Sequence, residues 1–435
     1  MDFFRVLSVA EVHRLIAEIP RPALAVENVP LSEARGRVLA SPVVAPEDVP
    51  GFSRSTVDGY AVRARETFGA GESLPALLDV VGEVPMGRPP DRPLREGEAM
   101  YIPTGGMLPD GADAVVKVEH VEAMDSLLNV YRPVSPGQNV IFRGEDALAG
   151  EPVLAQGTVL RPYELAFLAS LGISRVDVYA PLSVYLFSTG DELVPYETKT
   201  LRLGQVRDTN ALALRLMVEE AGARASMGGI IPDEEGAFVR AVEDGLHRSA
   251  LVILSGGSSV GVRDLTLKVL EERFQADILF HGISLHPGKP TLLARVGERY
   301  VLGLPGNPAS ALVVFFLFGL PLLARLAGEK RYEPTYLKAR TKRPIASVAG
   351  RTDYYRVRLH WEEGAWWAEP VLGKSGLLFT LVGSDGLMEI PAEKEGLLIG
   401  EEGKVYLLDR RRAMSPPLRL ARDGRLTMRS DREEA

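Results

Sequence analysis

The sequence contains no cysteine among its 435 residues. Disulfide bonds, thiolate metal sites and cysteine nucleophiles are therefore excluded, and any thiol in the chemistry must belong to a ligand. The sequence also lacks a long block of charge of one sign, because 50 Lys and Arg face 58 Asp and Glu. This distribution predicts no binding to nucleic acid or to an acidic membrane surface, so an anionic ligand needs a local basic pocket.

Long hydrophobic runs are scarce, and no secretory signal pattern is present. Residues 1–10 are mixed and acidic rather than basic and then apolar, so a cytoplasmic location is the default expectation. One apolar run, from Ala309 to Ala324, is shorter than the ~20 residues of a spanning helix and contains Gly319 and Pro321. We predict a buried helix there, with a membrane span as the much less favoured alternative.

The pattern of apolar residues changes along the chain, and the length predicts about three domains at ~150 residues each. Short alternating runs broken by Pro and Gly between about residues 77 and 160 indicate a β-rich part. From Leu182 strand and helix patterns alternate, which predicts a parallel sheet with helices on both faces and ligands at the carboxyl ends of its strands. After Glu329 strand patterns indicate a small antiparallel barrel or sandwich, followed by a polar, Arg-rich tail from Arg410.

A glycine-rich loop follows the apolar strand Leu251 to Leu254. Glycine backbone, hydroxyls and the N-terminus of a helix expected to begin near Asp264 favour binding of a phosphate or a pterin. An ordinary turn, with Asp264 as a simple N-cap, is an equal alternative. The loop residues are Gly256, Gly257, Ser258, Ser259 and Gly261.

Carboxylates follow two further predicted strands. Thr189 and Gly190 lead into Asp191 and Glu192, and the strand near Ala225 to Ile231 ends at Pro232 and Asp233. Hard cations such as Mg²⁺ prefer oxygen ligands, and a nucleotide phosphate shares such an ion. For each residue taken alone, the alternative to metal binding is a carboxylate in a solvent-exposed turn.

Two more loops are stiffened by proline. Pro305, Gly306, Asn307 and Pro308 follow the strand Tyr300 to Leu302, which suits either the rim of a ligand site or a rigid helix entry. Lys289, between two prolines, is either an anion contact or an ordinary surface lysine.

Three polar loops in the first half have no evident structural need for their particular residues. They carry Asp58, Thr104, and Arg143 with Asp146. Each carboxylate or hydroxyl can simply cap its own backbone.

Taken in order, these motifs resemble those of the molybdopterin molybdenumtransferases, the family called MoeA in bacteria and gephyrin in animals. The matching stretches are Asp58-Gly59-Tyr60-Ala61, Thr104-Gly105, Gly144-Glu145-Asp146, Thr189-Gly190-Asp191-Glu192, Gly256 to Gly261, Pro287-Gly288-Lys289-Pro290 and Pro305-Gly306-Asn307-Pro308. They extend over about 250 residues. Agreement in that order is not expected by chance.

The resemblance implies a multidomain α/β plus β fold. It divides the chain into an elongated linking domain (1–50 and 147–178), a β-rich domain (51–146), an α/β/α molybdopterin-binding domain with a parallel sheet (179–328), a small C-terminal β-barrel (329–409) and a polar tail (410–435). It also implies a homodimer in which the α/β domain of one subunit faces the β-rich domain of the other. A molybdopterin adenylyltransferase and molybdoenzyme apoproteins are the further partners it suggests.

The implied reaction inserts molybdenum from molybdate into adenylylated molybdopterin with release of AMP, helped by Mg²⁺. The resemblance assigns catalytic roles to Asp58, Thr104, Asp146, Glu192, Asp233 and Asp264, and metal binding to Glu192 and Asp264. Substrate binding would fall to Arg143, Thr189, Gly190, Gly256, Gly257, Ser258, Ser259, Gly261, His286, Lys289, Pro305, Gly306, Asn307 and Pro308.

The sequence departs from the family where bacterial relatives carry two lysines before the Pro-Gly-Lys-Pro loop. The matching residues here are Gly282 and His286. Arg143, Lys289, Arg351 and His281 are the alternatives for binding the oxyanion. The choice between molybdate and tungstate also stays open.

Two other functions are compatible with the same motifs. One is a molybdopterin carrier or scaffold without turnover, which the many carboxylates disfavour because simple carriage of an anion does not need them. The other is the related adenylyltransferase, which shares the α/β domain but resides in bacteria on a stand-alone domain.

Overall fold

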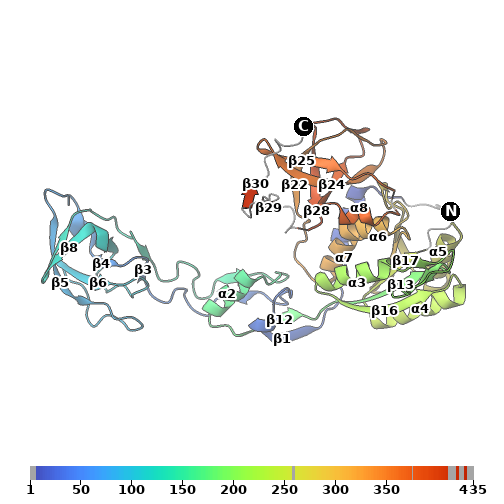
Figure 1. Ribbon diagram of the computed structural model, residues 1–435. Coiled ribbons are helices and arrows are strands. Elements are labelled where there is room, and N and C mark those ends of the chain that lie inside the picture. Colours follow the sequence, from blue (N-terminus) through green and yellow to red (C-terminus); the bar gives the residue numbers. More distant parts are fainter. Residues whose placement is uncertain (1–5, 257–259, 375, 410–417, 421–425, 429–435) are drawn as a thin grey trace. The chain divides into compact units, whose positions relative to one another are not determined.

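The computed structural model describes residues 6–256, 260–374, 376–409, 418–420 and 426–428 (Figure 1). Contacts divide the chain into two compact units. The first unit comprises Met1–Glu27, Gly36–Ala40 and Val178–Ala435, and the second comprises Asn28–Arg35 and Ser41–Asp177. The finer division into four domains stays a prediction.

The second unit is built around a six-stranded sheet, as its short alternating runs predict. The strand order is β7-β4-β6-β5-β9-β8. Neighbouring residues point to opposite faces, so Val115 and Val116 enter two separate apolar clusters. The strands are β4 (Gly59–Val62), β5 (Ala76–Glu83), β6 (Glu98–Ile102), β7 (Ala114–Lys117), β8 (Val121–Met124) and β9 (Leu127–Val130).

Short elements complete this unit. Strand β3 pairs antiparallel with β10, and β2 with β11. The bounds are η1 (Leu31–Glu33), β2 (Val43–Val44), β3 (Arg54–Ser55), η2 (Ala64–Thr67), η3 (Val118–His120), β10 (Val140–Ile141), β11 (Pro152–Leu154) and α2 (Pro162–Ser170), with β1 (Val26–Pro30) and β12 (Arg175–Tyr179) at the junctions with the first unit.

The first unit contains the predicted α/β domain. Its sheet has the order β16-β13-β17-β21-β20-β18, and the first four strands are parallel. Strand β20 runs antiparallel to β21, and β18 at that edge runs antiparallel to β20, a feature that the sequence analysis did not anticipate. The strands are β13 (Ser183–Thr189), β16 (Arg224–Ile231), β17 (Leu251–Gly256), β18 (Asp277–His281), β20 (Leu292–Val296) and β21 (Arg299–Leu304).

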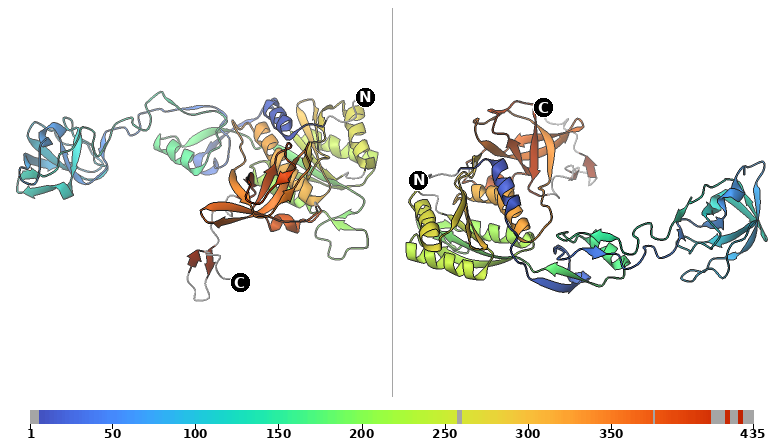
Figure 2. Two further views of the ribbon diagram at one scale, coloured as in Figure 1. Left: turned by 90° about the horizontal axis from the view of Figure 1, so that it is seen from above. Right: turned by 180° about the vertical axis from the view of Figure 1, so that it is seen from behind.

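Helices cover both faces of this sheet (Figures 1 and 2). Ile253 of β17 faces a cluster with Leu214 and Val218 of one helix, whereas Val252 faces a cluster with Phe238 and Val242 of another. Apolar residues on both sides of the central strands explain their near-continuous hydrophobic runs. The helices are α3 (Asn210–Glu220), α4 (Glu235–Arg248) and α5 (Val260–Phe274), and the small pair β14 (Leu193–Val194) and β15 (Val206–Arg207) precedes α3.

The apolar run forms one continuous helical stretch that belongs to the core. It consists of α6 (Pro308–Val314), a π-helical turn η4 (Phe315–Gly319) and α7 (Leu320–Leu326). Its length and composition would allow it to cross a membrane, but 78% of its most apolar window is buried in the protein. The predicted buried helix is therefore confirmed. Helix α1 (Val9–Glu18), which begins with a capping box formed by Ser8 and Glu11, packs against it.

The C-terminal region contains a closed five-stranded barrel. Strands β24, β25, β22, β28 and β26 are paired in that order, and β26 pairs again with β24 to close it. A sixth strand, β19, adds to β24 from the α/β domain. The bounds are β19 (Leu285–His286), β22 (Tyr336–Thr341), β23 (Ile345–Ala346), β24 (Thr352–Glu362), β25 (Ala365–Pro370), α8 (Phe379–Val382), β26 (Gly386–Ile390), β27 (Gly396–Leu397), β28 (Glu402–Leu407), β29 (Leu418–Leu420) and β30 (Leu426–Met428).

Candidate functional site

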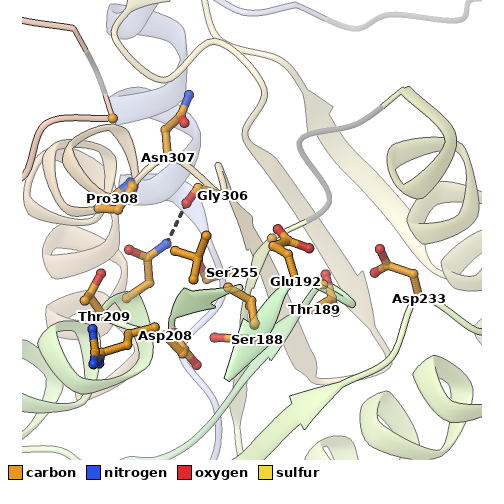
Figure 3. A pocket seen from close by; sticks show the side chains of 17 residues that line it. Ser188, Thr189, Glu192, Asp208, Thr209, Asp233, Ser255, Gly306, Asn307 and Pro308 are labelled. Atoms are coloured by element: carbon orange, nitrogen blue, oxygen red, sulfur yellow. Dashed lines mark hydrogen bonds between the residues drawn. The ribbon is translucent and has the colours of Figure 1, made fainter. Parts of the chain in front are cut away.

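A cavity of about 410 Å³ lies at the carboxyl ends of the parallel strands (Figure 3). The strand register creates it, because Thr189 of β13 lies beside Ile231 of β16 and Gly256 of β17. The loops after all three strands consequently open at one edge of the sheet. The predicted site residues that line the cavity are Thr189, Gly190, Glu192, Asp233, Gly256, Gly306, Asn307 and Pro308.

Gly256 allows β13 and β17 to approach closely at the cavity. Its φ is +140°, and a Cβ added there would lie 2.3 Å from the carbonyl oxygen and 2.4 Å from Oγ1 of Thr189. Gly190 has a φ of +150°, and a Cβ there would lie 2.7 Å from Oε2 of Glu192. Both positions require glycine, which leaves backbone groups open to a ligand.

Two carboxylates, Glu192 and Asp233, line the cavity, and Asp191 lies next to Asp233. Burial, together with the negative charges of Asp191 and Glu192, raises the pKa of Asp233 above its usual range. The backbone N–H of Asp233 donates to Oδ1 of Asp191 at 3.2 Å. Figure 3 shows Glu192 and Asp233 beside Thr189. Within the described parts of the chain, no three His, Asp or Glu side chains form a complete ligand set for a metal ion.

Polar residues that the sequence analysis missed form the opposite wall. Asn210, at the start of α3, donates from Nδ2 to Ser255 Oγ at 2.7 Å and to the carbonyl oxygen of Gly306 at 2.9 Å. Ser188 and Asp208 also line the cavity. These residues were hard to recognise as site residues in the sequence, because a serine inside an apolar strand and an Asp or Asn at a helix start usually have structural roles.

A second cavity, of about 690 Å³, begins on the other side of the loop before α6. Asn307 lines both cavities, and Pro305, His286 and Lys289 line the second. Arg351 completes a basic wall, although its guanidinium is paired at 2.9 Å with the buried carboxylate of Asp353.

His286 contributes little positive charge to that wall. Burial lowers the pKa of His286, and the neighbouring Arg351 and Arg356 lower it further against the opposing effect of Asp353. The imidazole is therefore mainly neutral near pH 7.

Four predicted residues, Asp58, Thr104, Arg143 and Asp146, lie in the second unit. Asp58 accepts hydrogen bonds from the backbone N–H of Thr104 at 2.7 Å and from its Oγ1 at 2.9 Å, and these bonds lower the pKa of the Asp58 carboxyl. Arg143 pairs with Asp48 at 2.6 Å. The exposed Asp146 donates its backbone N–H to the carbonyl oxygen of Val49.

Comparison with known proteins places these loops in a family. The chain is 37% identical over 345 residues to the molybdopterin molybdenumtransferase of Haemophilus influenzae, covering 79% of this chain and 83% of that protein. The chain belongs to the MoeA family. Family models match the MoeA N-terminal region (domains I and II) at residues 7–172, the molybdopterin binding domain at 185–325 and the MoeA C-terminal region (domain IV) at 338–408.

Two further relatives match nearly the whole of this chain. The molybdopterin molybdenumtransferase of Synechococcus elongatus is 34% identical over 403 residues, 92% of this chain and 98% of that one. A crystal structure of the molybdopterin biosynthesis MoeA protein from Pyrococcus horikoshii is 34% identical and gives a TM-score of 0.78, covering 93% of this chain and all of that one. The resemblance inferred from the motifs is thereby confirmed.

The glycine-rich loop of this MoeA protein is only partly described. Gly257, Ser258 and Ser259 lie outside the described residues, and for Gly261 and Asp264 only the helical backbone is described. The expected helix start near Asp264 is wrong, because α5 begins at Val260. Asp264 therefore lies inside the helix and cannot be its N-cap, since a capping residue has non-helical backbone.

Proposed function

We propose that this protein inserts molybdenum from molybdate into adenylylated molybdopterin, releasing AMP and forming molybdenum cofactor. Two relatives that match most of the chain carry the name molybdopterin molybdenumtransferase. The observation that carries the proposal is the cavity at the sheet edge, where Gly256, Thr189 and Asn307 bring backbone and polar groups together. Because the protein has no cysteine, the dithiolene sulfurs of the pterin supply the soft ligands for molybdenum.

The carboxylates of the cavity fit a role for Mg²⁺ in this reaction. Glu192 and Asp233 disfavour a bare phosphate. Burial raises the pKa of Asp233 first, and the negative charges of Asp191 and Glu192, which a divalent cation would offset, raise it further. Glu192 and Asp264 are the proposed protein ligands. Mg²⁺ commonly uses one or two carboxylates and takes its other ligands from water and phosphate. When bound it would neutralise charge on the phosphates.

The second cavity is the proposed site for the oxyanion. Lys289 brings positive charge to it, Arg351 shares its charge with the buried carboxylate of Asp353, and Ser310 adds a hydroxyl to the lining. The imidazole of His286, being mainly neutral, acts as a hydrogen-bonding group there rather than as a counter-charge. Asn307 lines both cavities, so an oxyanion in one lies across a single loop from the pterin in the other.

A homodimer is the proposed assembly, with the loops of Asp58, Thr104, Arg143 and Asp146 completing the site of the partner. Support comes from their chemistry, because two hydrogen bonds from Thr104 hold the exposed Asp58 in place and lower the pKa of its carboxyl. In a C2-symmetric dimer, mixing Asp58→Asn with Glu192→Gln subunits leaves one intact site in each mixed dimer.

That arrangement gives a numerical test. After unfolding and random reassociation of the two inactive variants, about a quarter of wild-type activity should return, because half of the dimers are mixed and half of their sites are intact. Each variant reassociated with itself is the control. Failure of activity to return would place both residues in a site formed within one subunit.

The reaction itself is tested with purified protein, adenylylated molybdopterin, Mg²⁺ and molybdate. AMP release and reconstitution of an apo-molybdoenzyme are expected, whereas pterin binding without AMP release would favour a carrier. Formation of pterin adenylate from ATP and molybdopterin would instead identify an adenylyltransferase. We place the reaction in the cytoplasm, after an adenylyltransferase that supplies the substrate and before apoproteins that receive the product.

A further inference from the structure

Part of the lining of the first cavity comes from the C-terminal barrel. Gly376 lines this cavity, although it belongs to the segment between β25 and α8. We call residues 371–374 and 376–378 the barrel loop. A Cβ added to Gly376 would lie 3.8 Å from Oδ1 of Asn307, the residue that lines both cavities. The position of the barrel loop therefore sets part of the lining beside the boundary between the two cavities.

Apolar packing does little to hold the barrel loop in place. Leu372 and Leu377 are 75% and 54% exposed, and Gly373 and Lys374 are exposed as well. A segment without regular secondary structure and with few buried side chains opens locally at a low free-energy cost. Polar contacts must therefore fix the loop against the α/β domain.

Arg356 of β24 supplies such contacts on both sides of Gly376. Its Nη2 donates to the carbonyl oxygen of Gly373 at 2.6 Å, and its Nη1 donates to Oγ1 of Thr380 at 2.5 Å. Gly373 lies three residues before Gly376, and Thr380 lies four residues after it. Because the guanidinium is planar and its donors form a rigid fork, one side chain fixes both ends of the loop at once.

The two ends of the loop also meet each other closely. A Cβ added to Gly373 would lie 2.6 Å from Cγ2 of Thr380. The Thr380 hydroxyl accepts from Arg356 and donates to the carbonyl oxygen of Leu377 at 2.5 Å, as a hydroxyl can do both. Arg356 and Thr380 are only 8% and 7% exposed, so water competes little for these charge-assisted bonds.

We propose that Arg356 is a positioning residue, which holds Gly373 and Thr380 and thereby keeps Gly376 in place as part of the first cavity. Arg356 acts through the barrel loop, because it is not among the described residues that line either cavity. The inference rests on the proposed function only for the identity of the substrate.

Trypsin cleavage after Lys374 tests the clamp directly in the full-length protein. Arg356→Lys keeps the positive charge but removes the fork of donors. Cleavage in the absence of ligand, followed by mass spectrometry, should become about three- to tenfold faster, because proteolysis follows the population of the open loop. An unchanged cleavage rate would overturn the proposal.

Arg358→Lys is the matched control for this substitution. Arg358 lies two residues further along β24 and on the same face of the strand. It donates from Nε to the carbonyl oxygen of Gly383 at 2.8 Å, on the far side of α8, and is exposed. Cleavage after Lys374 should proceed at the wild-type rate in this variant. Equal acceleration in both variants would show a general loosening of the barrel and would overturn the proposal.

Steady-state kinetics separate positioning from a merely structural role. In Arg356→Lys, KM for adenylylated molybdopterin should rise about three- to tenfold, because the loop occupies its place in fewer molecules. The turnover number kcat should stay within about twofold of wild type, since saturating substrate draws the loop back into place. A lower kcat at constant KM would indicate only a loss of folded protein and would contradict the positioning role.

Thr380 provides a second pair of variants that leaves Arg356 intact. Thr380→Val removes the hydroxyl at nearly constant volume, whereas Thr380→Ser keeps it. Thr380→Val should accelerate cleavage after Lys374 and raise KM in the same way as Arg356→Lys, and Thr380→Ser should restore both to wild-type values. Wild-type behaviour of Thr380→Val would contradict the clamp.

Cleavage is measured without substrate, so the inference and the proposed function fail separately. A wild type that releases no AMP, with faster cleavage in Arg356→Lys and Thr380→Val, contradicts the function and supports the clamp. A wild type that releases AMP, with unchanged cleavage in both variants, supports the function and contradicts the clamp.

Discussion

Replacing Gly256 by alanine tests the close approach of β13 and β17 at the cavity. The added Cβ would lie 2.3 Å from a backbone oxygen of Thr189, which cannot rotate away as a flexible side chain would. The φ of +140° adds backbone strain of about 1–3 kcal/mol for a residue with a Cβ. Relief of the overlap requires the strand ends to separate, at a further cost of about 1–3 kcal/mol.

The expected loss of unfolding free energy is therefore about 2–6 kcal/mol. Gly297→Ala is the matched control, because Gly297 has a φ of +60° but its added Cβ meets no atom within 4 Å. That variant should lose only about 1–2 kcal/mol through backbone strain. The difference between the two variants combines the steric cost with the difference in backbone strain between φ values of +140° and +60°.

Denaturant unfolding monitored by circular dichroism measures both losses, and AMP release measures the effect on the site. Gly256→Ala should abolish most activity, whereas folded Gly297→Ala should retain it. Equal destabilisation of the two variants would refute the tight contact between β13 and β17, and with it the reason for glycine at this position.

Three further predictions follow from individual side chains. The pKa of Asp233 is raised in the folded protein, so its ionisation lowers the stability of the fold as pH increases through that pKa. Asp233→Asn should therefore stabilise the protein at pH 8 but not at pH 3.5. Thermal unfolding at the two pH values measures this difference. Lys289→Met should raise KM for molybdate about 10–100-fold, the effect of a lost charge-assisted hydrogen bond, with KM for the pterin nearly unchanged in steady-state assays. Asp58→Ala removes the acceptor of both hydrogen bonds from Thr104 and should reduce kcat at least about tenfold, with little change in the unfolding midpoint because the pair is exposed; full activity would contradict its role in the site.

Much of the first cavity was predictable because parallel strands end at one edge of their sheet. The apolar runs that became β13, β17 and β21 located that edge, and polar or glycine residues followed each of them. Glu192 and Asp233 were therefore placed together correctly from their positions after strands. Periodicity also identified the buried helix and the alternating faces of the sheet in the second unit.

The other features of the site and sheet could not be predicted, because they depend on which strands lie side by side and not on the local sequence pattern. Asn210 resembles an ordinary helix-start residue until the order of the strands brings it beside Ser255 and Gly306. Ser188 resembles a tolerated polar residue within an apolar strand. The antiparallel β18 and β20 were missed because pairing direction is set by the connections between strands and not by their composition.

The added strand β19 joins the C-terminal barrel to the second cavity. Leu285 and His286 of β19 pair with Thr352 and Asp353 of β24. The Pro-Gly-Lys-Pro turn therefore begins where the α/β domain is already joined to the barrel. A protein cut before residue 329 would lose Arg351 and leave the edge of β19 bare. The barrel region thus contributes Arg351 to the second cavity, and a truncated chain would keep most of the first cavity while losing part of the lining of the second.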